Sequence, residues 1–171
     1  MIFKSLHESL VKKKIIKSLE LLNDQTRIKP KPIKTIGCII DPMFPVEVNN
    51  FIKLVYRIGL KEKDLKLITF QENDNGFNIF SNMNITPKSI SYTGNLKGKD
   101  SLEFISYDYD LLINFFKSND VLTLLSSKVN AKFRVGFSSV DSRLNDLIFS
   151  EKIKKFKEFD SELIKYLRII K

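Results

Sequence analysis

The sequence predicts a single α/β domain of Rossmann-like type, with a mainly parallel sheet flanked by helices. Three observations lead to this expectation. Short apolar runs rich in β-branched residues alternate with segments of helical spacing. The alternation occurs twice as a strand–helix–strand pattern, which is typical of parallel strands. Finally, 43 % of the 171 residues are apolar and only 11 are glycine or proline, which suits one ordinary core.

The first segment has apolar residues at helical spacing in two offset stripes. One stripe holds Phe3, Leu6 and Leu10, and the other runs from Val11 to Leu22. We expect an N-terminal amphipathic helix that either bends or packs on two partners. The prolines at 30 and 32 then favour extended backbone. The chain therefore divides into a basic amphipathic helix with a proline-containing connector, residues 1–34, and a single α/β domain, residues 35–171.

Each predicted element of the domain follows from its local pattern. Apolar runs rich in β-branched residues predict strands that are buried on both faces. Gly59 is placed to end the helix predicted at 46–58. Residues 71–108 are broken by turn residues, so the short strands predicted there rest on the weakest pattern. The expected order is strand 35–40, helix 46–58, strand 65–70, short strands 77–80 and 89–93, strand 109–116, helix 121–129, strand 132–137, a short strand or helical turn at 144–149, and a closing helix at 161–170 capped by Asp160 or Ser161.

The net charge of +9 lies at the two ends of the chain. Residues 1–34 carry nine Lys or Arg against three acids, and residues 151–171 carry seven against four. Basic ends on a neutral body favour a protein or RNA partner, or an acidic membrane surface. Because lysine outnumbers arginine 24 to 5, an AT-rich genome also explains the charge. The candidate residues for contact with an anionic partner are Lys12, Lys13, Lys14 and Lys17.

Several kinds of chemistry lack their usual residues. One histidine and one cysteine cannot build a His/Cys metal cluster, and neither nucleotide-binding glycine pattern follows the first strand. We therefore expect no metal and no cofactor, and we identify no catalytic residue. Cys38 is expected to be a small core residue. The lone cysteine, the missing apolar leader and the short apolar runs predict a cytoplasmic protein without a transmembrane segment.

In a parallel sheet, ligands bind beyond the carboxyl ends of the strands. The polar residues that follow the predicted strands are candidates for binding a phosphate or carboxylate, and Asp41 and Arg143 are expected to pair there. The alternative is structural: Ser118 or Asn119 caps the next helix, and Asp141 and Arg143 pair with each other or with Asp146. The candidate ligand-binding residues are Asp41, Asn114, Ser138, Asp141 and Arg143.

Residues 109–116 (YDLLINFF), 131–137 (AKFRVGF) and 143–147 (RLNDL) resemble segments of small uncharacterised α/β proteins of Bacteroidota. This resemblance covers most of the chain and implies no known activity. Part of the same region is similar to the N-terminal half of the ADP-heptose lipopolysaccharide heptosyltransferases. That similarity implies a Rossmann-like half of a two-domain glycosyltransferase, although Asp41-Pro42-Met43 replaces the glycine-containing turn of that family.

Three hypotheses about function follow. The leading one is a non-catalytic binding or interaction module, because nucleophile, metal and phosphate-loop signatures are missing while the ends are basic. The alternative is an enzyme that binds a small ligand or phosphate at the carboxyl ends of the strands. The third is a protein associated with RNA or the ribosome through its basic N-terminal helix.

Overall fold

The structure, a computed structural model, describes residues 2–43, 46–72, 83–153 and 155–169. Its strands form one six-stranded, all-parallel sheet in the order β3-β2-β1-β4-β5-β6. This is the Rossmann strand order, which reverses between β1 and β4. The predicted α/β, Rossmann-like fold is confirmed. The strands are β1 Ile36–Ile40, β2 Leu65–Phe70, β3 Met83–Ile85, β4 Asp108–Phe115, β5 Asn130–Phe137 and β6 Leu147–Phe149.

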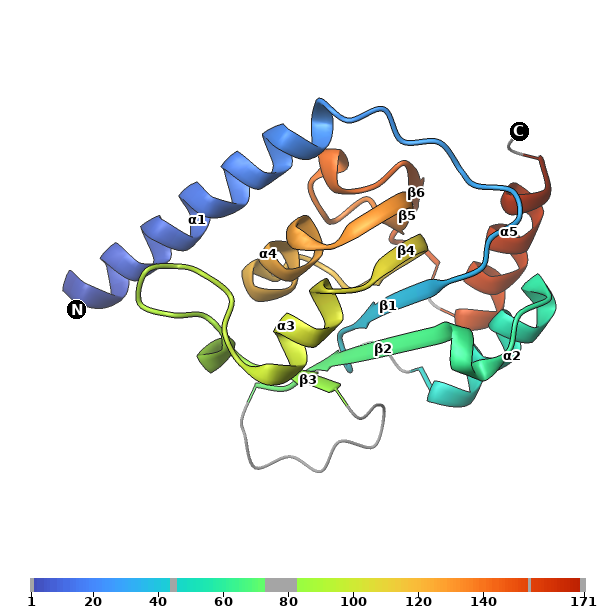
Figure 1. Cartoon of the computed structure of the whole chain (residues 1–171), viewed down its shortest axis with the longest axis horizontal. Coiled ribbons are helices and arrows are strands. Elements are labelled where there is room, and N and C mark those ends of the chain that lie inside the picture. Colours follow the sequence, from blue (N-terminus) through green and yellow to red (C-terminus); the bar gives the residue numbers. More distant parts are fainter. Residues whose placement is uncertain (1, 44–45, 73–82, 154, 170–171) are drawn as a thin grey trace.

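Helices cover both faces of the sheet (Figure 1). Helices α1, α3 and α4 lie on one face, and α2 and α5 lie on the other. The central strands are therefore covered on both sides, which explains the nearly continuous apolar runs of β1 and β4. The helices are α1 Ile2–Asn23, α2 Val48–Ile58, α3 Lys99–Ile105, α4 Asp120–Lys128 and α5 Phe156–Ile169.

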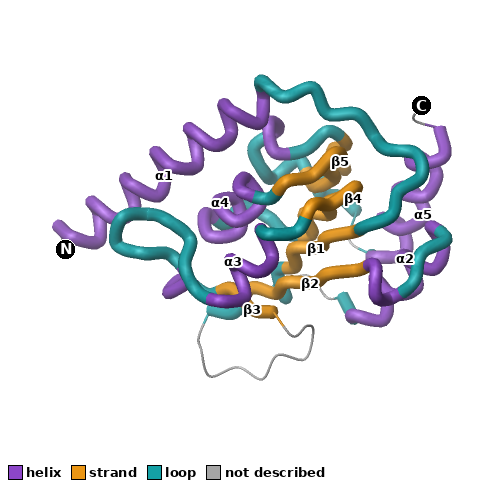
Figure 2. Tube along the Cα trace, in the orientation of Figure 1, coloured by secondary structure: helices purple, strands orange, loops and turns teal. Residues whose placement is uncertain are grey.

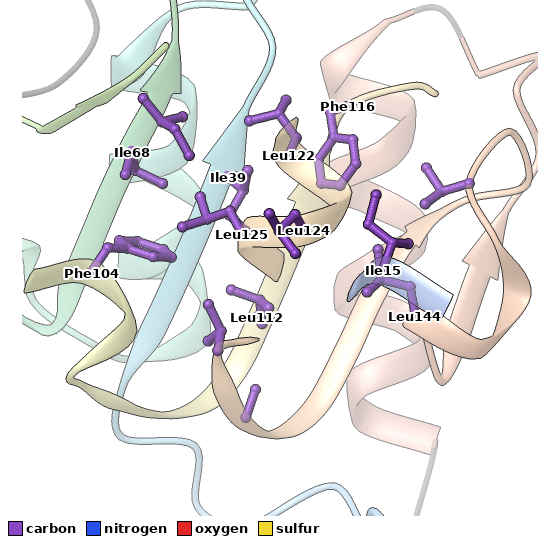
Figure 3. Close-up of a cluster of buried hydrophobic side chains, with 14 of the residues drawn as sticks. Ile15, Ile39, Ile68, Phe104, Leu112, Phe116, Leu122, Leu124, Leu125 and Leu144 are labelled. Atoms are coloured by element: carbon purple, nitrogen blue, oxygen red, sulfur yellow. The ribbon is translucent and has the colours of Figure 1, made fainter. Parts of the chain in front are cut away.

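The two halves of the core differ in composition. Under α4 the core is mainly aliphatic, and Leu112 of the sheet belongs to the same cluster as Leu122 and Leu125 of α4 (Figure 3). Under α2 and α5 it is aromatic, and the ring of Phe115 lies 5.1 Å from that of Phe159 and 5.4 Å from that of Phe51. Both contacts are edge-to-face, the geometry that aromatic rings favour. The two halves are separate clusters on opposite faces of the sheet, and each fixes its own helices over that face.

Helix α1 lies against α4 and against the 3₁₀ turn Ser142–Leu144, but its two offset stripes are not both buried. The helix runs alongside α4 (Figure 2), and its later stripe, which includes Val11 and Leu19, is buried in the same core. Its early stripe stays outside this core, and the side chain of Phe3 is 86 % exposed. On that part of the helix His7 Nε2 bonds to the carbonyl oxygen of Ser91 at 2.9 Å. The boundary proposed at residue 34 stays a prediction.

Two of the predicted elements are wrong in part or in full, and a third lies outside the described residues. The strand expected at 89–93 is wrong: only Ile90 forms an isolated bridge, to Leu96, and a hydrogen bond from the Gly94 amide to the Ser91 carbonyl then turns the chain. The closing helix begins at Phe156, so Asp160 and Ser161 lie inside it and cap nothing. The strand expected at 77–80 lies outside the described residues.

The sequence analysis missed β3 and α3, which fill the region between β2 and β4. Helix α3 is short, and a hydrogen bond from the Asn84 amide to the Asp100 carboxylate ties β3 to it. The remaining strands and helices lie within a few residues of their predicted bounds, and Gly59 ends α2 with a φ of 92° as expected. Within the described residues no helix is both long and apolar enough to cross a lipid bilayer.

Candidate functional site

The carboxyl ends of β1, β4 and β5 lie side by side, because these strands are parallel neighbours in the sheet. Asp41 follows β1 directly, and its backbone amide bonds to the Phe115 carbonyl at 3.1 Å. Its carboxylate accepts a hydrogen bond from the Met43 amide at 3.0 Å, and the residue is only 8 % exposed. Asp41 therefore lies at the predicted edge and closes the turn that leaves it.

Asn114 points away from that edge and into the interior beneath α4. Its Nδ2 donates to the Oδ1 of Asn145 at 2.7 Å, and its Oδ1 accepts from the Ser126 hydroxyl at 2.7 Å. The side chain is fully buried. The nitrogen and the oxygen of the Asn114 side-chain amide therefore both have partners inside the protein, so Asn114 is not available to a ligand.

The same interior contains a fully buried arginine that sequence reasoning missed, Arg134 of β5. Its guanidinium donates to the backbone carbonyls of Ser126 and Val129 at the end of α4. Burial, and after it the charge of nearby Arg27, lower its pKa to about 10, although the carboxylate of Asp146 acts in the opposite direction. An arginine between the apolar residues Phe133 and Val135 of the predicted strand was the available signal. Its contacts join β5 to α4 and are structural.

The loop after β5 keeps its charges paired with each other. Arg143 donates through Nε and Nη2 to both carboxylate oxygens of Asp141, at 2.9 and 2.7 Å. This bond lowers the pKa of Asp141 and raises that of Arg143. The expected pairing of Arg143 with Asp41 is wrong, because the nearer carboxylate two residues away holds it in a bidentate bond. Ser138 is exposed, and its amide donates to the Phe149 carbonyl.

The polar residues after β4 follow the structural alternative. The side chain of Asn119 accepts a hydrogen bond from the Leu122 amide at 3.1 Å and is the N-cap of α4. Cys38, in the middle of β1, is fully buried, and burial raises the pKa of its thiol. In the described parts of the chain no three His, Cys, Asp or Glu side chains gather closely enough to hold a metal ion.

The lysines predicted to contact an anionic partner divide into two pairs. Lys12 and Lys13 are exposed on α1. Lys14 and Lys17 face Lys128 at the end of α4: the pKa of Lys128 is lowered by partial burial and then by the charges of these two lysines. Lys14 also donates to the Asn95 side chain at 2.9 Å. We call Lys14, Lys17 and Lys128 the lysine cluster.

The lysine cluster adjoins a hollow between the C-terminal ends of α1 and α4. The hollow has a volume of about 230 Å³ and lies where β5 begins, at the opposite edge of the sheet from Asp41. Ser18, Gln25 and Lys128 are among its polar lining residues. Ser18 is 3 % exposed, and its hydroxyl has no hydrogen-bond partner within the described residues. Lys128 therefore lies beside polar residues of α1 and of the chain that follows it, Ser18 and Gln25.

Comparison with known proteins assigns almost the whole chain to one family. Residues 7–170 match a family described as "Family of unknown function (DUF6913)". No curated protein and no solved structure gives a significant match. The family description names neither an organism nor an activity, so the likeness to Bacteroidota proteins and to heptosyltransferases stays a prediction.

Proposed function

The chain belongs to the DUF6913 family, whose function is unknown, and we propose that it is a non-catalytic binding module that holds the phosphate backbone of RNA on the face formed by α1 and α4. The observation that carries this proposal is the lysine cluster. Three like charges from two helices meet there, and within the described residues none of the three forms an ion pair. Gathering like charges costs free energy in the free protein, and a bound polyanion relieves that cost.

The shape of the surface suits a chain of phosphates better than a single anion. Lys13, Lys14 and Lys17 occupy little more than one turn of α1, and Lys128 extends the charge onto α4. The packing of α1 on α4 fixes the distance between the two sets of charges. Contacts between lysine and phosphate position a nucleic acid without reading its bases. We therefore expect binding with little sequence preference.

The hollow beside the cluster adds neutral donors to the cations. The Ser18 hydroxyl and the Gln25 amide line it next to Lys128. Hydroxyl and amide groups commonly bond to phosphate oxygens.

The enzyme alternative has less support. Of its candidate residues, Asn114 is buried in the interior and Arg143 is held by Asp141. No unpaired cation among these five candidates is left to bind a phosphate. We propose a reducing cytoplasm as the compartment, because the one cysteine is a buried free thiol.

The test measures binding of a fluorescently labelled uridine oligonucleotide by anisotropy over a series of salt concentrations. We expect affinity to fall steeply with salt. Replacing Lys14, Lys17 and Lys128 together by glutamine should lower the slope of log K against log salt by about 2, since each phosphate contact on a single strand contributes about 0.7. The matched control replaces the exposed lysines Lys53, Lys63 and Lys152 by glutamine and changes the net charge equally.

Two outcomes would overturn the proposal. In one, the control triple variant loses as much of the slope as the cluster variant, which would show that only net charge matters. In the other, polyglutamate binds as tightly as the oligonucleotide and competes with it, which would indicate an acidic protein partner. Unfolding curves for both triple variants establish that each is folded.

A further inference from the structure

We propose that a groove between the connector, α2 and α5 is a second binding site, for a small organic anion with an apolar body. The groove has a volume of about 350 Å³, at the lower end of the range for small-molecule sites. The proposal is independent of RNA binding, because none of the groove residues belongs to the lysine cluster.

The groove forms where the two basic ends of the chain meet. The connector leaves α1, crosses the molecule and passes beside the end of α5 before it enters β1 (Figure 1). Lys29 and Lys31 come from the connector, Arg168 comes from the last turn of α5, and Arg57 comes from the last turn of α2. Charges that are far apart in the sequence therefore line one cavity.

Lys29 is the buried cation of this site, and a hydrogen bond holds it in place. It is only 6 % exposed, and its Nζ donates to the Leu167 carbonyl at the end of α5, at 2.8 Å. Burial and the neighbouring charge of Lys31 both lower its pKa. An ammonium group has three protons to donate. The structure describes one acceptor for Lys29, and no described carboxylate pairs with it.

The other cations leave the groove positive. Arg57 is paired with Asp160 of α5. Neither Lys31 nor Arg168 forms an ion pair with any described residue, and both side chains are exposed at the rim. A carboxylate or phosphate at this rim would gain charge-assisted hydrogen bonds from groups that are already close together.

The rest of the lining is apolar. Ile33 and Ile58 from one side and Ile164 and Leu167 from α5 form the walls, together with the two connector prolines. A simple inorganic anion would leave these walls in contact with water, whereas an aliphatic or aromatic body would cover them. The complementary ligand therefore has one anionic group and an apolar part.

The experiment uses the fluorescence of anilinonaphthalene sulfonate, an amphiphilic anion, bound to the full chain. Octanoate and octyl phosphate should displace it, which covers the carboxylate and phosphate forms of the same chemistry. Octylammonium, which has the wrong charge, and acetate, which has no apolar body, should not. Arg168→Gln and Lys29→Met should each weaken binding by about tenfold, because each removes a hydrogen bond to a charged group.

Lys165→Gln is the matched control, because Lys165 lies on the same helix and outside the groove lining. It should leave the affinity unchanged. If Lys29→Met proves unstable, the exposed pair Lys31→Gln and Arg168→Gln tests the same charges. Equal displacement by octanoate and octylammonium, or unchanged binding by every groove variant, would overturn the proposal. Displacement by polyglutamate but not by octanoate would also overturn it and indicate a peptide partner.

Discussion

The carboxyl ends of the strands and the lysine cluster differ in whether their polar side chains have hydrogen-bond or ion-pair partners inside the protein. At the strand ends Asp41 closes a turn, Asn119 caps a helix, and Asp141 and Arg143 hold each other. In the lysine cluster three cations lie together without a described acidic partner. Residue type and position suggested ligand binding in both regions. The comparison shows that internal partners decide which groups stay available to a ligand.

Gly136→Ala should give the largest effect, because it breaks the interior bonds that hold Asn114. A Cβ at position 136 would lie 2.5 Å from Nδ2 of Asn145, too close for either atom to stay in place. We expect a loss of about 2 kcal/mol in the free energy of unfolding, measured by urea denaturation. In an Asn145→Ala background the same change should cost clearly less. Equal costs in both backgrounds would show that this contact does not matter.

Asn119→Ala tests whether a strand-end residue serves the fold. Loss of the N-cap of α4 should lower the free energy of unfolding by about 1 kcal/mol, and Asn119→Asp should retain most of it. Thermal or urea unfolding measures both variants. A ligand-binding residue without a capping role would tolerate alanine with no loss of stability, and that result would favour the enzyme alternative.

Asp110 and Lys132 form an ion pair, unlike the lysines of the lysine cluster. Burial raises the pKa of Asp110, but hydrogen bonds from Lys132 Nζ and from the Lys34 amide outweigh it and leave the pKa below its usual value. Because the pKa is lower in the folded state, the pair stabilises the fold at neutral pH and loses this effect as the pH falls below about 4.

Asp110→Asn should therefore cost about 1 kcal/mol at neutral pH, and its difference from the unmodified chain should shrink in acid. Urea unfolding at several pH values measures the difference. A cost that is the same at pH 3 and pH 7 would contradict the assigned pairing.

Lys17→Gln should have the smallest effect and the opposite sign. Removing one of three unpaired like charges should raise the free energy of unfolding by about 0.3 kcal/mol at low salt. The gain should vanish at high salt, where surface charges are screened. Lys132→Gln, which breaks an ion pair, should lower the same quantity. If Lys17→Gln were destabilising, Lys17 would have a partner inside the protein.

The sequence predicted most of the sheet because parallel strands buried on both faces carry a strong local signal, as in the strand predicted at 35–40, which matches the fully buried β1. It missed α3 and β3, which are short and carry no long period. The start of α5 was misplaced because polar side chains at 157, 158 and 160 weaken the repeat that Phe156 and Phe159 begin.

The candidate sites were less predictable, because segments distant in the sequence come together to form them. Lys14 and Lys17 were found from charge alone, but nothing in the sequence links them to Lys128. The groove was equally hidden, since Lys29 and Arg168 meet only after the connector crosses the molecule. Both sites depend on tertiary packing between segments that the sequence pattern treats separately.

The most direct test is an NMR titration of the ¹⁵N-labelled chain with the uridine oligonucleotide, followed in amide spectra. The account predicts that the largest shift changes fall on residues 13–18 of α1 and 127–130 at the end of α4, and that they disappear in the lysine-cluster triple variant. Shift changes concentrated at residues 41–43 and 138–143 would contradict it, because they would place the partner at the carboxyl ends of the strands.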